Sequence, residues 1–342
     1  MSLGISSITV DCPYNVKDAP GQTLKMSATR YLTAESARNS QGLVLLFAHC
    51  IGANKEQWEP TIQRIFTLRP SVLHEAWAFD FQTHGESAAL NRKLLETSAS
   101  RQYGVSIFEW SDAITAFLDS PQMLGKRIVA VGHSVGAGAM TLAARGRALS
   151  SLPYESLILV EPMMTPRDLF YQEIDDRAAT MEFVVQATTA RRERWRSRDE
   201  AFSWMSRRVP WNAWDSRVVR KLVEDGLEDT PNGEVKIKGD RRQEALSYVD
   251  VEPQFAGPQE INRIAGTVPV HFIWGSESLM CPEYIISAVC NKQTAASVTT
   301  IDAGHMIIQE KPDLLADAIC AILDRNAAPG RDGSHGPPQS KL

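Results

Sequence analysis

The chain has 342 residues, of which 43% are hydrophobic and 23% charged, and its formal net charge is -5. This length allows one large domain or two ordinary ones, and the negative charge argues against a general nucleic-acid-binding protein. No apolar run approaches the roughly 20 residues of a membrane-spanning helix, and the first thirty residues hold no signal-peptide core. The five cysteines show no paired or metal-type spacing, so we expect free thiols and an intracellular protein.

The first half of the chain alternates patterns typical of strands and helices. Strands are expected in two opening segments and four later ones: 5–10, 24–32, 42–49, 74–81, 127–133 and 156–162. Helices are expected between the later strands: 55–68, 106–120 and the small-residue segment after Ser134. Continuously apolar strands such as GLVLLFAH are covered on both faces. Their alternation with helices predicts a mainly parallel sheet flanked by helices.

The strand pattern stops at Pro162, and a charged, helix-periodic and tryptophan-rich segment follows. Buried strands return at 268–275 and 297–302, and an amphipathic helix from Pro312 to about Leu323 closes the pattern. The sequence therefore predicts one α/β core with an insertion and a tail. We place these parts as follows: core, 1–161 and 264–326; mainly helical cap, 162–263; unstructured tail, 327–342.

Residues 132–136, GHSVG, fit the pattern G-x-S-x-G and lie directly between a buried strand and a small-residue helix. A nucleophile elbow needs this context, because its serine sits in a strained turn and its glycines let the chain pass closely. The N-terminal amides of the following helix would face a developing oxyanion. Ser134 is therefore the candidate nucleophile. The alternative is an ordinary strand-to-helix turn with an incidental serine.

A serine hydroxyl needs a base, and His305 lies in the turn between the last expected strand and the final helix. A histidine there would reach over the carboxyl ends of the strands toward Ser134. The alternative is a surface loop histidine. The other core histidines have structural explanations: His84 orders a turn, His133 packs beside the nucleophile, and His271 lies in a strand.

With these motifs the chain resembles the α/β-hydrolase superfamily from about residue 5 to residue 326. FAHCIGANKEQW resembles the His-Gly loop after the third strand, DFQTHGES resembles the D-x-x-G-H-G-x-S turn, and AGHM resembles the histidine turn. The resemblance implies an α/β-hydrolase fold with a cap inserted after the sixth strand. It also implies that the backbone amides of Ile51 and Val135 form the oxyanion hole. Cys50 departs from the pattern, which has glycine there, and we interpret it as a packed thiol.

The catalytic acid is the second departure from the family pattern. The acid usually follows the seventh strand, but Ser278 occupies that place and Glu277 is one residue short. Some family members carry the acid directly after the sixth strand, where this chain has Glu161. A carboxylate at the end of an apolar strand is costly unless a partner fixes it, and His305 would be such a partner. Glu161 is our first choice and Glu277 the second; otherwise Glu161 is a solvated residue at the cap hinge.

These residues predict a serine hydrolase that cleaves a carboxylic ester, lactone or thioester of a lipophilic acyl group through an acyl-enzyme on Ser134. An acyltransferase that uses the same serine and a non-catalytic binding protein with this fold are the alternatives. We expect no cofactor and no metal, because the sequence has no G-x-G-x-x-G, no G-K-[ST] loop and no cluster of His, Cys and Asp ligands.

The cap segment 183–214 combines apolar and aromatic residues with many arginines. It fits an apolar acyl pocket with arginines near a charged group, such as the phosphates of an acyl-coenzyme A thioester. It also fits an amphipathic cap whose tryptophans pack inward while its charges face water. We favour the second interpretation.

The last three residues, Ser340, Lys341 and Leu342, match the C-terminal tripeptide that the peroxisomal import receptor reads. Together with the core motifs they resemble the fungal peroxisomal α/β-hydrolases, of the peroxisomal lipase and host-selective toxin biosynthesis types. That resemblance implies a peroxisomal location, binding to the import receptor, and a role in lipid or toxin metabolism.

Overall fold

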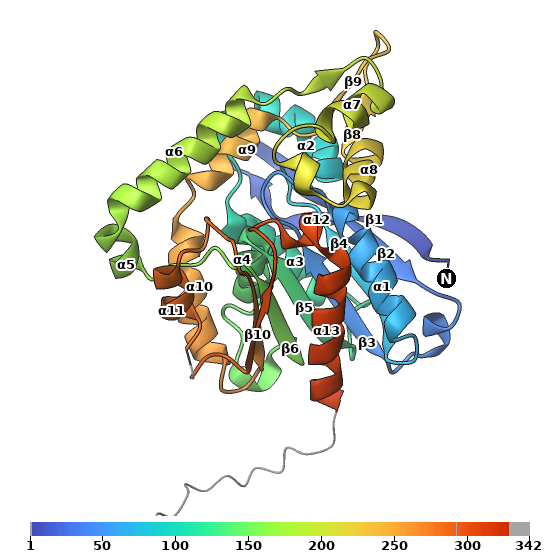
Figure 1. Ribbon diagram of the computed structural model, residues 1–342, viewed down its shortest axis with the longest axis vertical. Coiled ribbons are helices and arrows are strands. Elements are labelled where there is room, and N and C mark those ends of the chain that lie inside the picture. Colours follow the sequence, from blue (N-terminus) through green and yellow to red (C-terminus); the bar gives the residue numbers. More distant parts are fainter. Residues whose placement is uncertain (1, 292, 328–342) are drawn as a thin grey trace, which may run out of the picture.

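A twisted central sheet organises the molecule in the computed structural model, which describes residues 2–291 and 293–327 (Figure 1). The strand order is β1-β2-β4-β3-β5-β6-β10-β11. All neighbours from β4 to β11 are parallel, and β2 runs antiparallel to both β1 and β4. The strands are β1 Gly4–Val16, β2 Ala19–Leu32, β3 Leu43–Ala48, β4 Leu73–Phe79, β5 Arg127–His133, β6 Ser156–Val160, β10 Val270–Gly275 and β11 Ser297–Ile301. The predicted mainly parallel sheet is confirmed.

Helices cover both faces of this sheet, and the alternation of side chains along β3 shows why. Val44, Leu46 and Ala48 belong to one buried cluster, whereas Leu43, Leu45 and Phe47 belong to another, because successive residues of a strand point to opposite faces. The first cluster includes residues of α3, α4 and α10, and the second includes residues of α1, α12 and α13. The core helices are α1 Glu59–Leu68, α2 Gly85–Thr97, α3 Ile107–Leu118, α4 Val135–Leu142, α10 Glu252–Ile264, α11 Glu283–Val289, α12 Ile307–Glu310 and α13 Pro312–Ala327.

Local signals explain where several helices begin. The side chain of Ser106 accepts a hydrogen bond from the amide of Phe108, and the Glu109 side chain accepts from the amide of Ser106, which caps the start of α3. The predicted helix 55–68 begins as a 3-10 turn, Lys55–Trp58, before α1. Helix α2 is not among the helices predicted from the sequence.

The inserted elements α6 to α9 lie together at one end of the core (Figure 1). They are preceded by α5, and their bounds are α5 Arg167–Gln172, α6 Ile174–Ala190, β7 Arg194–Trp195, α7 Arg198–Met205, α8 Ser216–Asp225, β8 Leu227–Asp229, β9 Val235–Ile237 and α9 Arg241–Tyr248. Strands β7, β9 and β8 form a small antiparallel sheet. Trp195, Trp211 and Trp214 are buried in a separate cluster with α7 and α8, so the cap has a small core of its own.

Helix α10 sits differently from the rest of the insertion. Ile261 and Ile264 are buried in the same cluster as α4 and the strands of the main sheet, so α10 forms part of the helical layer over the core. The predicted cap boundary at residue 263 therefore falls inside a core helix.

No helix in residues 2–291 and 293–327 is long and apolar enough to cross a bilayer. All five cysteines are free thiols. The predicted tail and its targeting residues Ser340, Lys341 and Leu342 lie outside the described residues, apart from Ala327 at the end of α13.

Candidate active site

Ser134 lies in a sharp turn between β5 and α4, and its backbone is strained, with φ 56° and ψ -120°. The flanking glycines make this turn possible. A Cβ on Gly132 would lie 2.4 Å from the carbonyl oxygen of Gly136, and a Cβ on Gly136 would lie 2.5 Å from the carbonyl oxygen of Ala48. The GHSVG segment thus has the geometry of a nucleophile elbow, as its sequence context indicates.

His305 lies in the loop between β11 and α12 and bridges Ser134 and Glu161. Its Nε2 atom is 3.1 Å from Oγ of Ser134, and its Nδ1 atom is 2.8 Å from Oε2 of Glu161. The carbonyl oxygen of His305 accepts a hydrogen bond of 2.8 Å from Nε2 of His133. Because His133 precedes the serine directly, this bond ties the histidine loop to the nucleophile elbow.

Glu161 follows β6 with a positive φ of 48°, and it is completely buried. Its carboxylate accepts hydrogen bonds from the amide of Gly275, at 2.6 Å, and from the hydroxyl of Ser278. A buried carboxylate is stable only when such donors replace its water. Ser278, which stands where the family pattern has its acid, therefore supports an acid that comes from another strand.

Glu277, the second choice for the acid, lies at the surface instead. Its amide donates a 3.0 Å hydrogen bond to the carbonyl of Ala303, which fixes the backbone of the loop. The Nδ1 atom of His305 has Glu161 as its carboxylate partner. The structure thus brings Ser134, His305 and Glu161 into one hydrogen-bonded row and leaves Glu277 out of it.

The two predicted oxyanion donors border the same cavity as Ser134. Ile51 lies in the loop after β3, and Val135 is the first residue of α4. Within the described residues, neither amide donates a hydrogen bond to the protein, so both are available to a ligand. The adjacent amide of Gly52 donates to Nε2 of His84 at 3.0 Å, which holds the loop in place. His84, which was expected to order its own turn, thus contacts the loop after β3.

A buried ion pair lies where the loop after β3 meets the loop after β4. The Lys55 ammonium lies 2.9 Å from Asp80 and 2.6 Å from Glu56, and the side chains of Lys55 and Asp80 are only 2% and 0% exposed. Burial alone would lower the pKa of Lys55, but the two carboxylates outweigh it and raise that pKa. Asp80 also accepts from the amide of Glu86 at 2.8 Å. The pair therefore connects the loop after β3 to the loop after β4.

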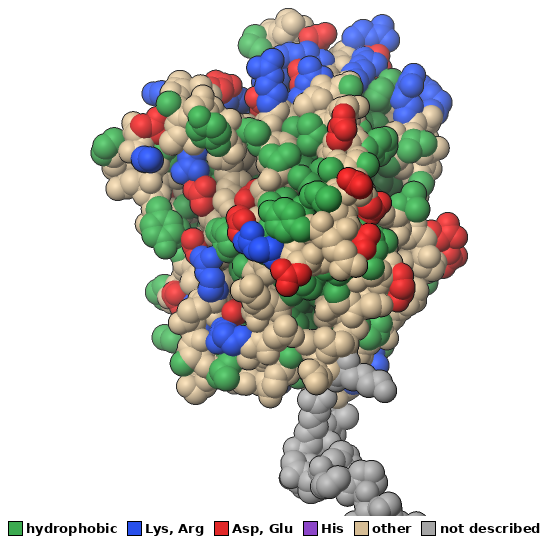
Figure 2. Space-filling view, turned by 90° about the vertical axis from the view of Figure 1, so that its left-hand side faces the viewer, with side chains coloured by type: hydrophobic (Ala, Val, Ile, Leu, Met, Phe, Trp, Pro, Cys, Tyr) green, Lys and Arg blue, Asp and Glu red, His purple; other side chains and the backbone are tan. Residues whose placement is uncertain are grey.

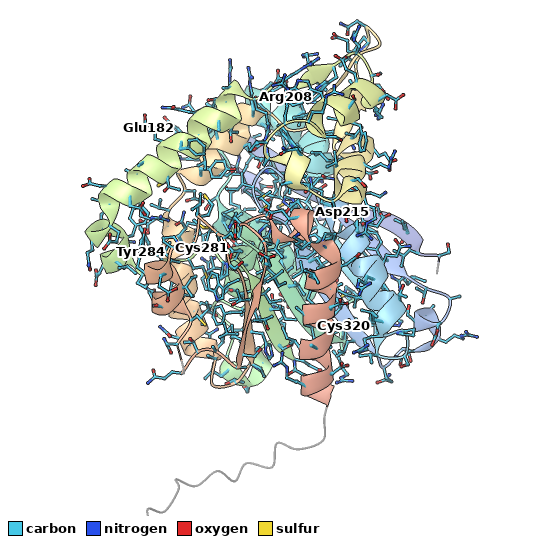
Figure 3. All side chains as sticks on the ribbon, in the orientation of Figure 1. Glu182, Arg208, Asp215, Cys281, Tyr284 and Cys320 are labelled. Carbon is cyan, nitrogen blue, oxygen red and sulfur yellow. The ribbon has the colours of Figure 1, made fainter. Side chains whose placement is uncertain are left out.

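Two thiols lie close to the site. Burial raises the pKa of Cys50 to about 12, which keeps this thiol protonated. Cys281 lies at the end of the core that the cap covers (Figure 3), and its Sγ atom is 4.0 Å from Nδ1 of His305. Burial is the main cause that raises the pKa of Cys281 well above its ordinary value, and the negative charge of Glu161 raises this pKa further.

Glu161, Cys281 and His305 are the one group in the described part of the chain whose ligand atoms lie close enough to share a metal ion, within 4.8 Å of one another. The same atoms of Glu161 and His305 already form a hydrogen bond. A metal ion would need the Nδ1 proton and the thiol proton to leave, so metal binding and the hydrogen-bonded row exclude each other.

A cavity of about 200 Å³ opens beside Ser134. Most of its lining is apolar and comes from both the core and the cap: Ile51, Met163, Phe170, Met181, Val184, Met280 and Met306. Arg177 also borders it, with 4% of its side chain exposed and a salt bridge of 2.6 Å to Asp176. The cavity can hold an apolar group next to the serine hydroxyl.

We expect the free energy of unfolding to fall as the pH drops below about 6.5. Burial lowers the pKa of His49, and lowers those of His84 and His133 well below the ordinary 6.5. The unfolded chain then binds protons that the folded chain excludes. This lowers the free energy of unfolding by up to about 1.4 kcal/mol per pH unit for each of His84 and His133, and His49 acts in the same direction. Urea denaturation at pH 7.5, 6.5 and 5.5 measures this. Equal stability at the three values would contradict it.

Comparisons with known proteins bear on this arrangement. Residues 45–318 match a family model described as "Alpha/beta hydrolase family". The peroxisomal alpha-beta-hydrolase Lpx1 from Saccharomyces cerevisiae is similar in structure, with 18% identity, a TM-score of 0.73, and coverage of 99% of this chain and 93% of that one. The Mycobacterium tuberculosis esterase Rv0045c is also similar in structure, with 17% identity and a TM-score of 0.63. The match covers 94% of this chain and 92% of that one. No curated protein matches.

A thioesterase domain from the curacin biosynthetic pathway is also similar, with 15% identity and a TM-score of 0.64, and the match covers 92% of this chain and 99% of that one. Identities this low show a shared fold. They leave the reaction to be argued from the site itself.

Proposed function

This chain belongs to the alpha/beta hydrolase family, and we propose that it cleaves a carboxylic ester, lactone or thioester of a lipophilic acyl group through an acyl-enzyme on Ser134. The observation that carries the proposal is the row of hydrogen bonds from Ser134 through His305 to Glu161, with distances of 3.1 Å and 2.8 Å. This order of nucleophile, base and buried acid is the arrangement that activates a serine hydroxyl.

In the first half of the proposed reaction, Nε2 of His305 takes the proton of Ser134 while Oγ attacks the acyl carbonyl. The amides of Ile51 and Val135 donate to the oxyanion of the tetrahedral intermediate. Glu161 stabilises the imidazolium. The intermediate then collapses, the bond to the leaving group breaks, and His305 gives its proton to the departing oxygen or sulfur atom.

In the second half, water enters where the leaving group was. His305 takes a proton from this water as it attacks the acyl-enzyme, and the second intermediate expels Ser134, which regains its proton from His305. The acid is released and the enzyme is restored. The apolar lining of the cavity beside Ser134, which includes Met163, Phe170 and Met280, supports a lipophilic acyl group.

A fluorophosphonate probe tests the proposal without knowledge of the substrate. The folded wild-type protein should be labelled at Ser134, Ser134→Ala should not be labelled, and wild type should hydrolyse p-nitrophenyl esters with a preference for medium over short acyl chains. Faster transfer of the acyl group to an added alcohol than to water would favour the acyltransferase alternative. An unlabelled wild-type protein would favour a binding role.

A peroxisomal location is a separate proposal, because it rests on Ser340, Lys341 and Leu342 being read at a free C-terminus. A fluorescent protein fused at the N-terminus should enter peroxisomes, and a short polar extension after Leu342 should leave the fusion in the cytosol. Import that is unchanged by the extension would contradict the proposal. A role in lipid or toxin metabolism depends on the same signal and stays a proposal with it.

A further inference from the structure

A second and larger cavity, of about 780 Å³, adjoins the one beside Ser134. The two cavities share four lining residues: Ile51, Val184, Tyr248 and Met306. Ile51 carries one of the proposed oxyanion donors. A substrate whose carbonyl lies at Ser134 can therefore place its acyl chain in the smaller cavity and its leaving group in the larger one.

The larger cavity differs from the smaller one in charge. Four arginines and one glutamate line it: Arg191, Arg192, Arg207, Arg208 and Glu244. The formal charge of the lining is therefore +3, from four positive side chains and one negative. We call this space the arginine cavity. Figure 2 shows Lys and Arg side chains gathered at the top of the molecule, which is the cap end.

Two of these arginines already have carboxylate partners. Arg191 forms a bidentate pair with Glu244, at 2.9 Å and 2.5 Å. Arg192 lies 3.2 Å from Glu200, which it shares with Arg196. The side chain of Arg191 is 16% exposed and that of Arg192 is 38% exposed. These pairs fix one wall of the cavity.

Arg207 and Arg208 lack such partners, since no described carboxylate lies within 4.0 Å of either guanidinium. Nη1 of Arg207 donates to the hydroxyl of Ser203 at 2.8 Å. The guanidinium of Arg208, which lies in the cap just after α7 (Figure 3), is 5.0 Å from the ring centre of Trp204. Both arginines are exposed, and these contacts leave most of their N–H donors open to water or to a ligand.

We propose that the arginine cavity binds a phosphate-bearing leaving group, so that the substrate is an acyl ester or thioester whose leaving group carries a phosphate. This inference rests on the proposed function. A phosphate monoester carries a charge of about -1.5 to -2. The two guanidinium groups without a described carboxylate partner, those of Arg207 and Arg208, carry +2 and so match a phosphate better than a single carboxylate. Arginine pairs with phosphate oxygens through parallel N–H donors.

The size of the cavity agrees with this assignment. A volume of about 780 Å³ lies within the range of small-molecule and cofactor sites, roughly 300–1,000 Å³. The apolar acyl cavity has only about 200 Å³. The larger cavity therefore has room for a leaving group that is bigger and more polar than the acyl group.

The test compares two thioesters of one acyl group, one with coenzyme A and one with the uncharged N-acetylcysteamine. Wild type should prefer the coenzyme A thioester in kcat/KM. The double variant Arg207→Gln/Arg208→Gln should lower that preference by about 10- to 100-fold, because it removes two charged donors. The matched control Arg38→Gln/Arg242→Gln loses the same charge from exposed arginines outside both active-site cavities and should keep the preference. A preference that Arg207→Gln/Arg208→Gln leaves intact would overturn the inference.

Fluorophosphonate labelling separates this inference from the proposed function. If wild-type Ser134 is not labelled, the proposed function fails, and the inference fails with it. If Ser134 is labelled, free coenzyme A at millimolar concentration should slow the labelling of wild type, and less so that of Arg207→Gln/Arg208→Gln. Equal protection by glutarate would overturn the assignment to phosphate while the proposed function stands.

Discussion

Glu161→Gln is expected to slow the labelling of Ser134 by a fluorophosphonate by about 10³- to 10⁴-fold, the loss typical of an acid that can no longer hold the catalytic histidine in the right tautomer. Three donors converge on the Glu161 carboxylate: the amide of Gly275, the hydroxyl of Ser278 and Nδ1 of His305. A glutamine side chain has one acceptor oxygen and an NH2 group that only donates. Its NH2 group must therefore face one of these donors. If it faces Nδ1 of His305, that atom must accept a hydrogen bond, and the proton of the neutral ring then lies on Nε2, which can no longer take the proton of Ser134.

Glu277→Gln is the matched control, because it makes the same chemical change one residue from Ser278 on an exposed side chain. Its labelling rate should stay within about twofold of wild type, since surface substitutions of this kind disturb little. Thermal unfolding of all three proteins checks that they remain folded. A large loss in Glu277→Gln with a normal rate in Glu161→Gln would reverse the assignment of the acid.

Lys55→Met is expected to lower the free energy of unfolding by about 3–5 kcal/mol, because it leaves the buried carboxylate of Asp80, and that of Glu56 beside it, without their cation. Asp80 is completely buried, and the Lys55 ammonium is its nearest cationic group, at 2.9 Å. Asp80 keeps the hydrogen bonds from the amides of Lys55 and Glu86, both at 2.8 Å. Those amides offset part of the lost charge, so the protein should still fold. Urea denaturation at pH 7.5 gives the change.

Two further variants make this stability prediction specific to the ion pair. Lys17→Met removes an exposed lysine and should change the unfolding free energy by less than about 0.5 kcal/mol. Asp80→Asn, added to Lys55→Met, removes the more deeply buried of the two carboxylate charges that lost their cation and should recover part of the loss, as expected for residues in contact. Additive losses in the double variant would show that the ion pair is not the source of the effect.

The sequence predicted the fold well, and it predicted the positions of the candidate site residues for one physical reason. Parallel strands end at a common edge of the sheet, so polar residues that directly follow apolar strands converge there. Ser134 directly follows β5 and Glu161 directly follows β6. His305 lies in the loop that follows β11. Each could be found from a local pattern of a few residues.

The parallel sheet, the nucleophile elbow and the insertion after β6 were all predictable from the amino-acid sequence, because the period of apolar residues and the positions of glycines act over short stretches of chain. Four features could be seen only in the folded structure. Ser278 donates to Glu161, His133 anchors the loop of His305, α10 packs with the core, and Arg207 and Arg208 have no carboxylate partner among the described residues. Ser278 and Glu161, for example, are 117 positions apart in the chain. Whether such side chains meet depends on hydrogen-bond distances and charge compensation, which exist only once the strands and the cap have packed.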